Sequence, residues 1–155
     1  MVVTPGPVRL RATRRIAADP TSTALLLAGP SALELWPGVR RVAEVAGRAL
    51  VETELRPAGE APRPTAASVT AQPPRRTPTA FVTRFSWTGP DLPVAVGVLT
   101  LTYAPGGQGT PSTAAELVLD LEGLEDSRLD DGALTALAQG FLVNLARAAE
   151  DRRAA

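Results

Sequence analysis

The chain has 155 residues, which is the size of one ordinary domain. Sixteen basic residues balance sixteen acidic ones, so the overall charge favours neither a nucleic acid nor an anionic membrane as a partner. The chain has no Cys and no His, and every basic residue is Arg. This composition excludes catalytic thiols, Ser-His triads, Schiff-base lysines and thiolate or imidazole metal sites. We therefore expect no metal and no cofactor.

Apolar runs in the sequence are short, such as the one covering residues 25–28. A signal peptide or a membrane-spanning helix needs a much longer run. We therefore predict a cytoplasmic protein with no membrane span. We expect one domain over residues 1–155, with flexible ends at 1–7 and 152–155.

The N-terminal part predicts one strand followed by two short helices. Apolar and polar residues alternate over 8–16, as in a half-buried strand. Asp19 is placed to cap a helix over 21–28, and Ser31 is placed to cap a second one over 32–35.

Six further strands are predicted in the middle of the chain, from alternating residues and intervening turns. They cover residues 39–46, 48–56, 66–72, 79–88, 94–103 and 113–122. The strand at 94–103 is apolar on both faces, which is typical of a central strand covered on both sides. Short hairpin connections predict an antiparallel sheet.

The C-terminal part changes to the period of a helix. Leu134, Leu137, Phe141 and Leu145 recur at intervals of three and four, and a cap is available at 130 or 131. A helix of about twenty residues is long enough to cover one face of the sheet. The predicted fold is therefore α+β, a seven-stranded curved antiparallel sheet around a long C-terminal helix.

Four segments resemble one known superfamily. They are RRIAADP at 14–20, LWPGVRRV at 35–42, QPPRR at 72–76 and LAQGFLVNL at 137–145. In this order they are similar to the START-like, or SRPBCC, superfamily of polyketide cyclases, dehydrases and lipid-transport proteins. The resemblance covers about residues 8–150 and has no diagnostic catalytic motif. It implies a helix-grip fold with a cavity for a hydrophobic small molecule between the sheet and the last helix.

Apolar residues at inward positions are the candidates for lining such a cavity. They are Trp36, Phe81, Phe85, Trp87, Leu99, Leu101, Tyr103, Leu117, Leu119, Leu137 and Phe141. The aromatic stripe within this set has two interpretations, because a tightly packed core uses the same residues as a cavity wall.

Other residues have a functional and a structural interpretation. Glu52 and Glu54 share a strand face at a spacing compatible with an acid/base pair, but we expect them to face solvent. The Gly-rich segment 106–109 lacks the Lys and the following helix of a phosphate-binding loop, so we interpret it as a hairpin loop. Arg75 and Arg76 are too isolated for a nucleic-acid site.

Three functions remain open. The first is non-catalytic binding of a lipid or polyketide, as a carrier or a sensor. The second is a polyketide cyclase or aromatase in which Tyr103 or Arg84 positions the substrate. The third is an accessory protein with a vestigial pocket, for which a homodimer is one expected form.

Overall fold

The computed structural model describes residues 8–29, 32–45, 48–55, 63–90, 92–105, 111–123 and 131–154. The segment 1–7, the predicted turn at Gly47 and the Gly-rich loop at 106–109 lie outside these residues.

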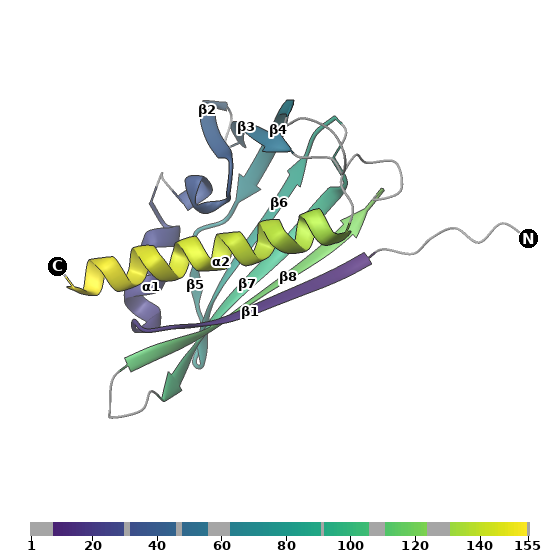
Figure 1. Ribbon diagram of the computed structural model, residues 1–155. Coiled ribbons are helices and arrows are strands. Elements are labelled where there is room, and N and C mark those ends of the chain that lie inside the picture. Colours follow the sequence, from purple (N-terminus) through teal and green to yellow (C-terminus); the bar gives the residue numbers. More distant parts are fainter. Residues whose placement is uncertain are drawn as a thin grey trace, which may run out of the picture.

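One antiparallel sheet forms the body of the molecule (Figure 1). Its strands are β1 (Val8–Ile16), β2 (Val39–Val45), β3 (Arg48–Leu55), β4 (Arg63–Ala71), β5 (Arg75–Arg76), β6 (Ala80–Thr88), β7 (Val94–Pro105) and β8 (Pro111–Glu122). The order across the sheet is β1-β8-β7-β6-β4-β3-β2, and β5 pairs with β6 off this path. The first strand, β1, therefore pairs with the last one, β8, and forms one edge of the sheet, while β2 forms the other edge.

The helices are α1 (Pro20–Leu27), the 3-10 helix η1 (Ala32–Leu35) and α2 (Asp131–Ala154). Asp19 caps α1 as predicted, since its carboxylate accepts from the Ser22 hydroxyl at 2.6 Å and from the Ser22 amide at 3.1 Å. The Ser22 hydroxyl bond holds the pKa of Asp19 below its ordinary value. Residues 152–154, expected in a flexible end, continue α2. Of the helices in the described segments, none is long and apolar enough to cross a bilayer.

Helix α2 crosses one face of the sheet and packs on β1 and α1 (Figure 1). The core lies beneath it. The fully buried leucines of this core are Leu99, Leu101, Leu117, Leu119, Leu121, Leu134, Leu142 and Leu145. The α+β helix-grip arrangement predicted from the sequence is therefore confirmed.

Three details of the sheet differ from the prediction. The two-residue strand β5, which is not among the predicted strands, adds an eighth strand. Strand β4 begins at Arg63 rather than at the predicted residue 66. Strand β7 is central but is not covered on both faces, because Val94 and Val96 are 44% and 51% exposed. Both α-helices lie on the same side of the sheet, which leaves the opposite face to solvent.

Candidate functional site

A cavity lies between the sheet and α2, on the side of β3, β4 and β6. Its volume is about 90 Å³. At ~10–15 Å³ for each water-sized site, this is room for roughly six to nine such sites. The cavity as it stands has room for a group of about single-ring size.

The wall is built from several elements that lie far apart in sequence. The sheet contributes Val39, Val51, Thr53, Ala67, Val69, Ala71, Thr83, Phe85, Trp87 and Leu99. The helices and connections contribute Leu27, Ala32, Leu33, Trp36, Leu92, Leu134, Leu137 and Phe141. On each strand the wall residues are alternate ones, since every second side chain points to the same face.

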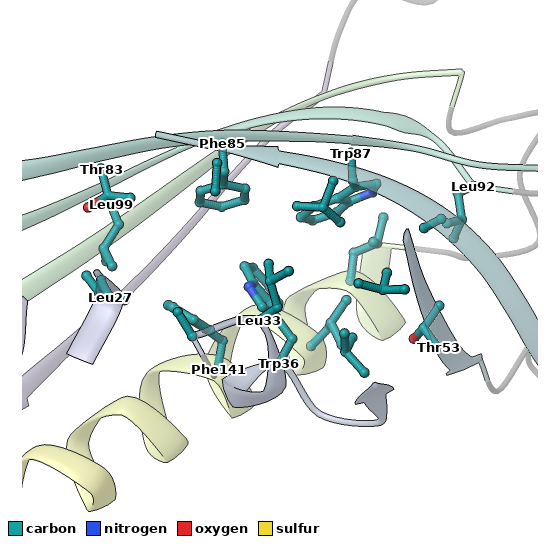
Figure 2. A pocket seen from close by; sticks show the side chains of 18 residues that line it. Leu27, Leu33, Trp36, Thr53, Thr83, Phe85, Trp87, Leu92, Leu99 and Phe141 are labelled. Carbon is teal, nitrogen blue, oxygen red and sulfur yellow. The ribbon is translucent and has the colours of Figure 1, made fainter. Parts of the chain in front are cut away.

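Four aromatic rings meet inside this cavity (Figure 2). Trp36 stacks on Phe141 with ring centres 4.4 Å apart, and meets Phe85 and Trp87 edge to face at 5.5 and 5.4 Å. Phe85 and Trp87 point from the sheet, whereas Trp36 and Phe141 rise from the opposite side. Trp36 is 8% exposed, so it forms an inner wall of the cavity.

Two contacts hold Trp36 at this place. The Asn144 side-chain amide on α2 donates to the carbonyl of Leu35, the last residue of η1, at 2.7 Å. Gly140 on α2 faces Pro37, and a Cβ at position 140 would lie 2.5 Å from the Pro37 Cγ. The close approach of helix and turn therefore needs a glycine at this position, and it brings Trp36 onto Phe141.

A glycine also makes room for the ring of Phe85 on the sheet. Its cross-strand neighbour on β7 is Gly97. A Cβ at Gly97 would lie 2.1 Å from the tip of the Phe85 ring, so the ring occupies the space that any other residue would fill. The ring therefore packs on the backbone of β7 and meets Trp36 edge to face.

The described lining is almost entirely hydrocarbon. Of its 18 residues, the only hydroxyl-bearing ones are Thr53 and Thr83, which are 5% and 7% exposed. These two threonines lie at opposite ends of the view in Figure 2. None of the lining residues in the described segments carries a charge. The site therefore suits an uncharged, apolar ligand that makes a few hydrogen bonds at the two ends of the cavity.

Six of the predicted residues lie on this wall, and they are Trp36, Phe85, Trp87, Leu99, Leu137 and Phe141. The other five lie elsewhere. Leu101, Leu117 and Leu119 are at most 1% exposed and are buried in the core. Phe81 is half-buried against that core. Tyr103 is 61% exposed, because β7 extends there beyond the cover of the helices.

The sequence prediction missed the part of the wall formed by β3 and β4. Val51 and Thr53 alternate on β3, and Ala67, Val69 and Ala71 alternate on β4. This period of two is visible in the sequence. The pattern does not tell that a cavity remains beside β3 and β4. The inward-facing side chains of β8, in contrast, are fully packed in the core.

Residues with a possible catalytic interpretation lie outside the cavity. Glu52 binds Arg40 at 2.9 Å on the exposed face of β3, as expected for a solvated carboxylate, and the side chain of Glu54 lies outside the described residues. Arg84 is exposed on β6. Within the described segments no three His, Asp, Glu or Cys side chains gather as a metal site would require.

Comparison with solved structures finds the same fold in several proteins. TTHA0849 from Thermus thermophilus is 18% identical, with a TM-score of 0.60 over 94% of this chain and 99% of that one. The Zhui aromatase/cyclase from Streptomyces sp. R1128 is 16% identical, with a TM-score of 0.61 over 94% and 95%. A START superfamily protein from Mycobacterium smegmatis is 18% identical, with a TM-score of 0.55 over 95% and 97%. At these identities the likeness shows the fold alone.

Comparison with curated protein sequences finds no match. The model of one family, described as polyketide cyclase / dehydrase and lipid transport, matches residues 7–150. This match covers nearly the whole chain and agrees with the helix-grip fold. The chain therefore belongs to the polyketide cyclase/dehydrase and lipid transport family.

Proposed function

We propose that the protein binds a hydrophobic small molecule, such as a lipid or a polyketide, in the cavity between α2 and the sheet, as a carrier or a sensor and without catalysis. The observation that carries this proposal is the lining, which is apolar apart from two threonine hydroxyls and the indole N–H groups of Trp36 and Trp87. Burial of apolar surface in such a site supplies the driving force for binding.

The family contains both lipid-transport proteins and cyclases, so the chemistry of the lining has to decide between them. A cyclase that acts by proton transfer needs a titratable side chain within reach of the substrate. The two candidates for this role, Tyr103 and Arg84, are both exposed and lie off the cavity wall. The position of these side chains therefore favours binding without turnover.

Filling the cavity tests this proposal. Ala67 on β4 lies on the wall, and its neighbour Ala66 is exposed on the other face of the same strand. We expect saturable binding of toluene to the natural protein by isothermal titration calorimetry. Ala67→Leu occupies the space of the ligand and lowers the affinity at least about tenfold, or ~1.4 kcal/mol. Ala66→Leu serves as the matched control and leaves the affinity unchanged.

Native mass spectrometry of freshly purified protein gives a second measurement. An apolar molecule that co-purifies with the natural protein and with Ala66→Leu is expected to be lost from Ala67→Leu. If toluene binds Ala67→Leu as tightly as it binds the natural protein, the cavity is not the binding site and the proposal is wrong.

A further inference from the structure

The hydroxyl of Thr53 is buried without a hydrogen-bond partner. The residue is 5% exposed, and its Oγ1 meets neither a donor nor an acceptor in the described part of the chain. Buried hydroxyls in proteins almost always have a partner, because the loss of water destabilises an unpaired one. A threonine in this state needs a physical reason.

Packing does not supply that reason. Valine has nearly the same shape, is equally compatible with a strand, and would fill the site without an unpaired oxygen. The preceding inward residue on β3 is indeed a valine, Val51, which is 4% exposed. The hydroxyl at position 53 therefore costs stability in the empty protein, and its benefit is expected in another state of the protein.

The position of Thr53 shows where a partner would come from. Its side chain lines the cavity, and Figure 2 places it at the end opposite to Thr83. Around it the wall is hydrocarbon, including Val39, Val51 and Leu92. A polar atom of a bound molecule is the partner that this arrangement leaves open, once rotation of the side chain turns the buried oxygen toward the cavity.

We infer that Thr53 binds an uncharged oxygen, a hydroxyl or a carbonyl, at one end of an otherwise hydrocarbon ligand. This inference rests on the proposed function, since it assigns a polar contact within the same cavity. A threonine hydroxyl both donates and accepts, so it satisfies either kind of oxygen. A carboxylate or phosphate does not match, because no described residue of the lining supplies a positive charge.

Three single-ring probes of similar size test this inference on the full-length protein. They are phenol, toluene and benzoate, which differ in carrying a hydroxyl, a methyl group or a charged carboxylate. Phenol is less hydrophobic than toluene, and this difference alone predicts a weaker affinity for phenol. In calorimetry with the natural protein, we expect the phenol affinity to exceed that predicted value at least about threefold, because of the hydrogen bond to Thr53. Benzoate is expected to bind at least about tenfold more weakly than phenol. Benzoate binding as tight as phenol binding would refute the assignment to uncharged oxygens.

Thr53→Val removes the hydroxyl and keeps the shape. We expect it to weaken phenol binding about three- to tenfold, to leave toluene binding unchanged, and to raise the melting temperature of the empty protein by about 2–4 °C. These opposite effects on stability and phenol affinity separate ligand contact from a structural role. Thr70→Val, on the exposed face of β4, is the matched control and keeps the ratio of phenol to toluene affinity, whereas Thr83→Val tests the other hydroxyl of the wall.

The outcomes distinguish the two proposals. If toluene binds and Ala67→Leu abolishes its binding, the cavity function holds. If Thr53→Val then lowers phenol and toluene affinity equally, or if Thr83→Val alone lowers the phenol preference, the role of Thr53 is refuted. If none of the probes binds, the proposed function itself fails.

Discussion

Phe85 and Gly97 form a pair in which each residue explains the other. The ring lies across the strand at the place where a Cβ of residue 97 would be. The place of this ring on the cavity wall therefore depends on the absence of one methyl group in the next strand. Aromatic rings on cross-strand glycines are a known way to stabilise a glycine within a sheet.

Gly97→Ala tests this pair. Because Cβ and ring cannot share the space, the ring has to turn into the cavity, and overpacking of this kind costs about 1–3 kcal/mol. We expect urea denaturation to show this loss, together with weaker toluene binding by calorimetry. Gly29→Ala is the control, since a Cβ there would lie 3.6 Å from the nearest atom, the carbonyl oxygen of Leu26. Toluene affinity unchanged in Gly97→Ala would show that the ring does not control the open space.

At the scale of the elements, the position of η1 on α2 decides where the cavity ends. The two elements meet through the bond from Asn144 to the Leu35 carbonyl and through the contact of Gly140 with Pro37. Trp36 follows directly in sequence and stacks on Phe141. The corner between η1 and β2 is therefore held by the same helix that forms one wall of the cavity.

Asn144→Ala is expected to loosen this corner. Loss of one hydrogen bond to a part-buried carbonyl costs about 1 kcal/mol. In a Trp87→Phe background, in which Trp36 is the only tryptophan, the emission of Trp36 is expected to shift to the red as its ring becomes exposed. Gln139→Ala, on the exposed face of the same helix, provides the comparison. An equal red shift in both variants would contradict the role assigned to Asn144.

At the scale of the whole molecule, the charged side chains of the ion pairs lie apart from the cavity. The net charge is zero, and the ion pairs of the described residues lie on the surface. One example is the bidentate contact of Arg9 with Asp120, at 2.8 and 3.3 Å between β1 and β8. Exposed pairs of this kind contribute little to stability. The cavity, in contrast, has no charged side chain among its described lining.

This separation predicts how binding depends on the solvent. Because no charge of the described lining is screened or titrated, toluene affinity is expected to change less than about twofold between roughly 0.05 and 0.5 M NaCl and between about pH 6 and 8. Titration calorimetry under these conditions measures it. A steep dependence on salt or pH would point to a charged group at the site.

The order of the elements was predictable from the sequence, because it depends on local signals. Asp19 begins a helix where expected, alternation marks the six longer strands that follow, and the period of 134–145 marks α2. The two-residue strand β5 has no such signal, since two residues are too few to show a period and their pairing with β6 is a tertiary contact. The alternation of the inward-facing residues on β3 and β4 is visible in the sequence, but it does not show that these residues line the cavity.

What the sequence by itself determined is the helix-grip class and the apolar faces that meet in it. Only the tertiary structure decided which part of the interface between helix and sheet is filled and which is open. Leu117 and Leu119 have the same alternation as Val51 and Thr53, yet the first pair is packed in the core and the second lines a cavity. The reason is that an open space depends on how two distant surfaces diverge. In this protein the spacing between α2 and the sheet depends on the contact of Gly140 with Pro37 and on the packing of Phe85 against Gly97.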